Sequence, residues 1–170
     1  MHTADRIVDS LNQLGIYFLA NSKNIVSSAP MAPAELIAAL ASSDEARIRA
    51  SLIPLFLYQP SYAKYVLPIF EALSPSEQIT LRCYYLAAFL LQRKYKQPLQ
   101  SLLGNQIEIP NLFILESPFS DPQLSHDAQL RHLGAEHARL SGKQLNWYGT
   151  YEHAYQRLAK HMQHRQQWLA

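Results

Sequence analysis

The chain has 170 residues, of which 48% are hydrophobic and only 16% are charged. The aliphatic and aromatic content excludes an intrinsically disordered chain, and the length suits a single helical domain over residues 1–170. A single cysteine, Cys83, excludes an internal disulfide framework and a cysteine-based zinc site. So few charges leave Gln, Ser, Tyr and apolar residues on the surface, which indicates a surface for a partner.

The N-terminal sequence MHTADRIVDSLNQLG lacks the charged and apolar regions of a secretory signal. No apolar run reaches the length of a membrane span. We therefore expect a cytoplasmic protein that does not engage a membrane.

Charge is divided unevenly along the chain. Residues 1–130 carry nine Lys/Arg against eleven Asp/Glu, whereas residues 131–170 carry six against two and five of the seven His. This gives a charge of −2 to the first segment and +4 to the second. A basic surface of this kind contacts nucleic acid or an acidic partner, or is simply solvated, and the sequence leaves these alternatives open.

Helical spacing begins near the N-terminus. Ile7, Leu11, Leu14 and Phe18 recur at spacings of four, three and four, which predicts one apolar stripe of an amphipathic helix. After a loop, Pro33 is expected to open a short helix that runs to residue 40.

Proline and capping residues predict the next helices. Ser42 and Glu45 form a predicted capping box ahead of a helix that Pro54 must kink or end early. Ser61 is expected to begin a further helix, which Pro68 bends.

The sequence SPSE is the clearest start signal in the chain. Ser74 is the predicted N-cap, Pro75 the first helical residue and Glu77 the capping-box partner of a helix that ends near Lys96. Three cations gather at its end and suit the negative end of the helix dipole: Arg93, Lys94 and Lys96.

A faint repeat relates residues 43–57 to residues 76–90 at an offset of 33 residues. Helix pairs of this length are typical of α-solenoids, but no third copy follows. We therefore predict an all-α, compact bundle of about seven or eight helices that contains a HEAT-like helical hairpin pair.

Residues 104–122 break the helical pattern. Three prolines and alternating apolar residues predict one long Pro-rich loop, irregular and too long for a free connection in a compact domain. We expect it to wrap across the helices, pinned by four apolar side chains: Phe113, Ile114, Leu115 and Phe119.

Two helices are expected to close the chain. The first runs from Ser125 to Leu140 and stops at Gly142 in a left-handed cap. The second starts at Thr150 as N-cap and continues to the end. Its predicted core stripe consists of Tyr151, Tyr155, Leu158, Met162 and Leu169. The opposite face is expected to be solvent-exposed and basic, and consists of His153, Arg157, Lys160, His161 and His164.

No phosphate loop, nucleophile elbow, HExxH or paired-cysteine motif is present. Arg131 and His137 have the Rx4–6H spacing of HEPN-type helical ribonucleases, in which the guanidinium holds a phosphate and the imidazole transfers a proton. However, His137 shares an apolar stripe with Leu130, Leu133 and Leu140. The sequence favours the alternative, a buried histidine bonded to a backbone carbonyl.

The aromatic segment GKQLNWYGTYEHAYQRL supplies candidate binding residues: Trp147, Tyr148, Tyr151, His153, Arg157 and His161. The favoured alternative is that Trp147 and Tyr148 fold back onto the core. His161 and His164 lack a third metal ligand nearby, so we expect no metal and no cofactor.

Three segments carry a resemblance: residues 36–60, residues 81–96 and residues 135–158. They resemble a group of bacterial helical proteins encoded beside small nucleotidyltransferase-like proteins. The resemblance implies one partner of a two-protein, toxin–antitoxin-like module. HEPN members of such modules carry an RxxxxHxY motif; here His153 and Tyr155 match its end, but Tyr148 stands where arginine is required.

The expected function is therefore that of a non-enzymatic protein-interaction partner, with a nucleotidyltransferase-like protein as the implied partner and a charge-poor helical surface as the contact. Three alternatives stay open. They are a metal-independent ribonuclease using Arg131 and His137, nucleic-acid binding by the basic last helix, and a homodimer.

Overall fold

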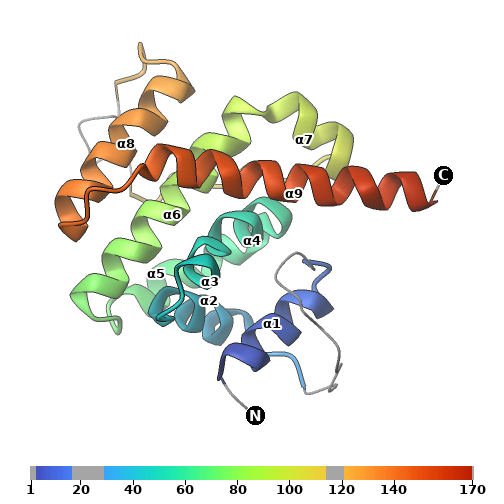
Figure 1. Ribbon diagram of the computed structural model, residues 1–170, viewed down its shortest axis with the longest axis horizontal. Coiled ribbons are helices and arrows are strands. Elements are labelled where there is room, and N and C mark those ends of the chain that lie inside the picture. Colours follow the sequence, from blue (N-terminus) through green and yellow to red (C-terminus); the bar gives the residue numbers. More distant parts are fainter. Residues whose placement is uncertain (1–2, 17–28, 114–120, 170) are drawn as a thin grey trace.

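Helices make up all of the regular secondary structure in the computed structural model, which describes residues 3–16, 29–113 and 121–169 (Figure 1). The elements are α1 (Thr3–Gln13), α2 (Pro33–Ser42), α3 (Ala46–Ala50), α4 (Leu52–Tyr58), the 3-10 helix η1 (Pro60–Tyr65), α5 (Val66–Phe70), α6 (Pro75–Lys94), α7 (Lys96–Leu103), α8 (His126–Ser141) and α9 (Trp147–Leu169). These ranges hold nine α-helices, of which α3 and α4 are separated by Ser51 alone and α6 and α7 by Tyr95 alone. The predicted all-α bundle is confirmed.

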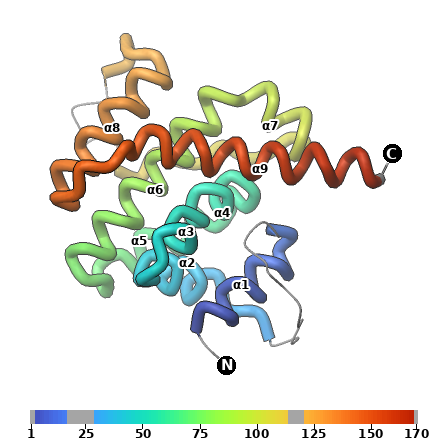
Figure 2. Tube along the Cα trace, viewed as in Figure 1, coloured from blue at the N-terminus to red at the C-terminus, as the bar shows by residue number. Residues whose placement is uncertain are grey.

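Helix α6 is the centre of the molecule. It packs against α2, α4, α8 and α9, and nearly all of its residues from Leu81 to Leu91 are buried. Phe56 of α4 meets Tyr85 of α6 edge-to-face, with ring centroids 5.0 Å apart. Helix α9 crosses this core, and its C-terminal end extends past the other helices (Figure 2). No helix in the three described ranges has the length and apolar character of a membrane span.

The strongest capping signals are confirmed. Ser74 accepts the backbone N–H of Glu77 at 3.3 Å, and its hydroxyl donates to the Glu77 carboxylate at 2.8 Å. The helix expected from about Ser125 is α8, and Ser125 is its N-cap, since its hydroxyl accepts a backbone N–H from the first turn. Gly142 ends α8 with a φ of 71°, a conformation that glycine adopts without strain.

The capping box predicted at Ser42 is wrong. Helix α2 runs to Ser42 itself, whose hydroxyl donates to the carbonyl of Ala38, so this residue ends one helix instead of starting the next. Glu45 is the residue that precedes α3. The expected effect of Pro54 is confirmed, because the helix breaks at Ser51 and Pro54 lies in the first turn of α4.

Three further predictions, for α1, for the helix from Ser61 and for the internal repeat, can be compared with the structure. Ile7 and Leu11 are buried in α1, while Phe18 lies outside the described residues. The helix expected from Ser61 begins one residue earlier as η1, and Pro68 lies within α5. Residues 43–57 contain the break between α3 and α4, whereas residues 76–90 lie within the uninterrupted α6, so the two aligned segments differ in their helix boundaries.

The Pro-rich segment is described as far as Phe113, and residues 104–113 lie across α6 as predicted. Tyr85 donates its hydroxyl to the carbonyl of Pro110 at 2.6 Å. The Gln92 side chain donates to the carbonyl of Ile107 at 2.9 Å and accepts the N–H of Ile109 at 2.7 Å. The buried side chain of Ile109 anchors this arm. Ile114, Leu115 and Phe119 lie outside the described residues.

Helix α9 begins four residues earlier than predicted, because Thr150 was the expected N-cap and Trp147 is the first helical residue. Asn146 is the residue that caps it: the side-chain oxygen accepts the N–H of Gly149 at 2.9 Å, and the carbonyl accepts the N–H of Thr150 at 3.1 Å. Thr150 therefore lies inside the first turn. Trp147 and Tyr148 are helical residues, and their aromatic side chains project from α9 in fixed directions.

Candidate functional site

Both residues of the predicted catalytic pair lie in α8, but in opposite environments. Arg131 is exposed, donates to Asp127 at 3.2 Å and lies over the ring of Tyr148, with 4.0 Å from guanidinium carbon to centroid. His137 is only 2% exposed. The structure therefore does not place the guanidinium and the imidazole together in one open groove.

His137 lies in an aromatic stack. Its ring is stacked on Trp147 with centroids 3.6 Å apart, and Tyr84 meets it edge-on. Its Nδ1 shares a hydrogen bond of 2.7 Å with the hydroxyl of Tyr151. The predicted burial of His137 is confirmed. The predicted hydrogen bond to a backbone carbonyl is wrong, because the partner is a tyrosine hydroxyl. Burial, and secondarily the charge of Arg49, lowers the pKa of His137 to about 4, which keeps the imidazole neutral at pH 7.

Gly134 allows the first turn of α9 to lie directly on α8. A Cβ atom at this position would approach the backbone nitrogen of Tyr148 to 3.0 Å and the Cβ of Trp147 to 3.6 Å. This contact positions the two aromatic residues on different sides of the helix crossing. Trp147 packs into the stack with His137, and Tyr148 packs toward Asp127.

A cluster of charges joins α6, α8 and the start of α9, and we call it the Lys94 cluster. It consists of Lys94, Tyr95, Asp127, Tyr148 and Glu152. The ammonium of Lys94 donates to Asp127 at 2.7 Å and also to Glu152. Tyr95 donates to the second oxygen of Glu152, and Tyr148 donates to Asp127. Glu152 is only 9% exposed, so these bonds satisfy a buried carboxylate.

The Lys94 cluster favours the charged forms of Lys94 and Asp127. Burial acts to lower the pKa of Lys94, but hydrogen bonds with Asp127, Glu152 and Tyr95 together raise it above its ordinary value. Hydrogen bonds from Lys94 and Tyr148 lower the pKa of Asp127. Lys94 thus has a different role from the predicted one, since it ties three helices together instead of only balancing the end of α6.

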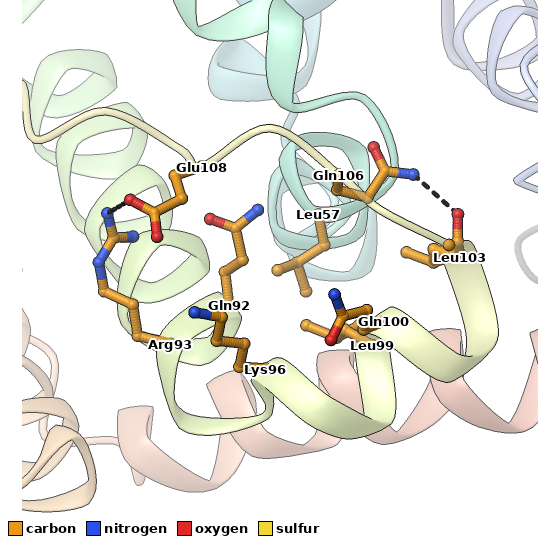
Figure 3. A pocket seen from close by; sticks show the side chains of 10 residues that line it. Leu57, Gln92, Arg93, Lys96, Leu99, Gln100, Leu103, Gln106 and Glu108 are labelled. Carbon is orange, nitrogen blue, oxygen red and sulfur yellow. Dashed lines mark hydrogen bonds and ion pairs between the residues drawn. The ribbon is translucent and has the colours of Figure 1, made fainter.

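A small pocket lies beneath the arm (Figure 3). Its volume is about 70 Å³, well below the few hundred Å³ of most ligand sites. Gln92 binds the arm backbone, and Arg93 donates to the carbonyl of Ile109 at 3.0 Å. Gln106 donates to the carbonyl of Leu103, as the dashed line shows. These polar groups serve the attachment of the arm, so this pocket is part of the packing.

A much larger groove, of about 580 Å³, lies between α3, α4 and the first half of α9. We call it the basic groove. Its walls carry four cations: Arg47, Arg49, Lys143 and Arg157. Among the described residues that line it, none is Asp or Glu. The N-terminal end of α9 also faces this groove and adds the positive end of a helix dipole.

The cations differ in how they are held. Arg47, Lys143 and Arg157 are exposed, and Arg47 forms a surface ion pair with Glu45 at 3.2 Å. Arg49 is half-buried and donates to the carbonyl of Ser43 at 2.7 Å, which fixes its direction. Within the described part of the chain, no ion pair engages Arg49, Lys143 or Arg157. Three of the four guanidinium and ammonium groups are thus open to an anion.

The floor of the groove is made of small and apolar side chains: Ala46, Ala50, Pro54 and Ala154. The side chain of Asn146 covers Gly149 beside them. Trp147 and Tyr84 also line it, but they are only 8% and 3% exposed, and one face of the Trp147 ring is covered by His137. Leu145 is 58% exposed at the connection between α8 and α9. The groove therefore joins an apolar floor to a cationic rim.

The structure distributes the six predicted binding residues among different environments. Trp147, His153 and Arg157 line the basic groove. Tyr151 is buried beneath it, and Tyr148 belongs to the Lys94 cluster.

His161 was predicted to lie on the solvent-exposed face of the last helix, and this prediction is wrong. It is half-buried beside Gly15, and burial is the main cause that lowers its pKa. The rest of the predicted core stripe that is described, Tyr155, Leu158 and Met162, is buried as expected; the side chain of Leu169 lies outside the described residues.

Sequence reasoning missed Arg47, Arg49 and Lys143. The first two lie about a hundred residues before Lys143 in the chain, and only the packing of α3 and α4 against α9 brings them to one groove. A partial signal was present in the +4 charge of residues 131–170. Comparison of the chain with protein-family models, with curated proteins and with solved structures found no match.

Proposed function

We propose that this protein is a non-enzymatic interaction protein that binds an acidic segment of another protein in the basic groove. The observation that carries the proposal is the presence of four cations and no carboxylate among the described residues that line the groove. A groove lined by one sign of charge concentrates ligands of the opposite sign and accelerates their association.

The contact surface differs from the one that composition favours. Low charge content pointed to a charge-poor helical face, whereas the basic groove is rich in one sign of charge. Electrostatic complementarity selects against wrong partners more strongly than apolar contact alone, and the proposal therefore uses the groove. The sequence resemblance adds a candidate partner, a nucleotidyltransferase-like protein encoded by the adjacent gene in a bacterial two-protein module.

The placement of His137 supports a non-enzymatic role. A metal-independent ribonuclease needs Arg131 and His137 in contact with the same phosphodiester. His137 instead faces the core, with one ring face against Trp147 and its Nδ1 bonded to Tyr151. Its low pKa also leaves the imidazole neutral at pH 7, so the protonated form that a general acid needs is hardly populated.

The experiment is co-expression of the tagged chain with the product of the adjacent gene, followed by purification and measurement of stoichiometry. The groove variant R47E/K143E/R157E reverses three exposed cations of the groove. The matched control K64E/K96E/K160E reverses three exposed cations elsewhere and changes the net charge equally, by two units at each of three positions. The wild-type chain and the control are expected to retain a stoichiometric protein partner, and the groove variant is expected to lose it.

Three outcomes would contradict the proposal. One is isolation of the wild-type chain with no stoichiometric companion. Another is a partner, or a second copy of the chain in a homodimer, that binds the groove variant as well as the wild type. The third is binding of single-stranded RNA that collapses with added salt and with the groove variant, which would identify a nucleic-acid interface.

A further inference from the structure

The side chains on the floor of the basic groove are arranged in helical rows. Ala46, Ala50 and Pro54 recur every fourth residue along α3 and α4. On the facing wall, Ala154 lies on the side of α9 that lines the groove, and the side chain of Asn146 covers Gly149. Small side chains in such rows let the backbone of a third helix approach closely, because the distance between packed helices depends on the side chains at the contact.

The cations lie along the edges of this floor. Arg47 and Arg49 flank the row of α3, Lys143 lies in the connection before α9, and Arg157 lies on α9. A helix lying on the floor would present its flanking residues to these groups. The complementary residues are Asp and Glu on both sides of an apolar stripe.

The groove is less suited to single-stranded nucleic acid. Such binding relies on exposed ring faces on which bases stack. Of the rings that line the groove, Trp147 and Tyr84 are buried and only the imidazole of His153 is exposed. A small anion is also a poor match, because three of the four cations lie exposed at the rim instead of converging in an enclosed site.

We infer that the basic groove receives an amphipathic, acidic α-helix, with apolar residues at positions i, i+3 or i+4, and i+7 against the floor and with carboxylates against Arg49, Lys143 and Arg157. The exposed Leu145 adds an apolar contact at one end of the groove. This inference rests on the proposed function and specifies the chemistry and the conformation of the segment that is bound.

A display library of random 16-residue peptides tests the inference. The library is sorted for binding to the wild-type chain and counter-sorted against R47E/K143E/R157E. Enriched peptides are expected to combine the apolar spacing of a helix with acidic flanks, and to bind the groove variant at least tenfold more weakly. A single proline at the centre of an enriched peptide is expected to reduce affinity at least tenfold, because proline breaks the helix. The control K64E/K96E/K160E is expected to bind like the wild type.

The outcomes separate this inference from the proposed function. Enriched acidic peptides without helical spacing, or peptides that tolerate a central proline, would overturn the helix and leave the proposed function intact. Failure to enrich any acidic peptide that needs the groove would also overturn the inference. The proposed function is decided independently, by whether the protein partner co-purifies with the groove variant. Displacement of the peptides by 12-nucleotide RNA at equal concentration would overturn both.

Discussion

The Lys94 cluster and the basic groove lie on either side of the first turns of α9, and they use positive charge in opposite ways. In the cluster, the charge of Lys94 is matched by those of Asp127 and Glu152, and Arg131 adds an exposed ion pair with Asp127 from outside the cluster. In the groove, four cations face a floor without a carboxylate among the described residues. The comparison shows two uses of positive charge. Cations paired with carboxylates hold helices together, whereas cations without a carboxylate beside them at a surface are available to bind a ligand.

The largest expected effect comes from removing the cation of the Lys94 cluster. Lys94→Met leaves Glu152, only 9% exposed, with Tyr95 as its remaining donor in the cluster. Breaking a buried charge pair in this way is expected to cost about 3 kcal/mol of the free energy of unfolding, measured by urea denaturation. Arg131→Ala, which removes an exposed partner of Asp127, serves as the control and is expected to cost far less. An equal loss of unfolding free energy in the two variants would show that the buried and the exposed ion pairs contribute alike to stability.

The next effect is a dependence of stability on pH that comes from His137. Its folded pKa of about 4 lies below the value of about 6.5 in an unfolded chain, so the unfolded state binds the proton first as the pH falls. The contribution to stability is complete above pH 6.5 and is lost between pH 6.5 and about pH 4. At pH 5 the loss is about 2 kcal/mol, since one pKa unit corresponds to about 1.4 kcal/mol.

His137→Gln isolates this contribution from the other groups that titrate. Urea denaturation at pH 7 and pH 5 is expected to show a smaller loss of stability in the variant than in the wild type. The same loss in both chains would show that His137 does not titrate across this range.

Gly134 lies beneath both regions and gives a smaller effect. Gly134→Ala gains about 1 kcal/mol of helix propensity, but its Cβ would meet the backbone nitrogen of Tyr148 at 3.0 Å. Overpacking of this kind costs about 1–3 kcal/mol, so the net change is expected to be a loss of about 1 kcal/mol. Thermal unfolding measures the loss, and near-ultraviolet circular dichroism reports the displacement of Trp147. A variant more stable than the wild type would show that the first turn of α9 can move at little cost.

The smallest expected effect on stability belongs to the groove. R47E/K143E/R157E changes exposed side chains, and the ion pair of Arg47 with Glu45 lies on the surface, so the free energy of unfolding is expected to change by less than about 1 kcal/mol. Urea denaturation of this variant beside Lys94→Met is the direct comparison of the two regions. A large loss in the groove variant would show that these cations support the fold.

Helix ends could be predicted from the sequence where the capping residue bonds to backbone groups close to it in the chain. Ser74 and Gly142 act through backbone groups within a few residues of themselves, and both caps were predicted correctly, as was the helix start near Ser125. The start of α9 was misplaced because Asn146 and Thr150 are both good N-caps four residues apart, and the sequence does not show which of them begins the helix. The failed capping box at Ser42 has a similar cause, since a hydroxyl can bond backward to its own helix as well as forward.

The candidate site could be predicted only in part. Trp147, His153 and Arg157 attracted attention because they share one aromatic and basic segment. The partners of Lys94 are 33 and 58 residues away, and no sequence pattern relates them. The burial of His137 followed from its apolar stripe, but its bond to Tyr151 depends on how α8 and α9 meet. Contacts between distant segments are therefore the information that the sequence pattern does not contain.

The length of α9 links the groove to a distant point on the surface. Its 23 residues form one helix of about 35 Å, which starts at the groove and ends beyond α7. Near that end, Gln166 donates to the carbonyls of Ser101 and Leu102, and the indole of Trp168 is 88% exposed. The two tryptophans of the chain therefore report on different places: Trp168 lies in solvent at the far end of α9, whereas Trp147 lines the basic groove. A change of indole emission on addition of a ligand is consequently expected to come from Trp147, with Trp168 as a constant background.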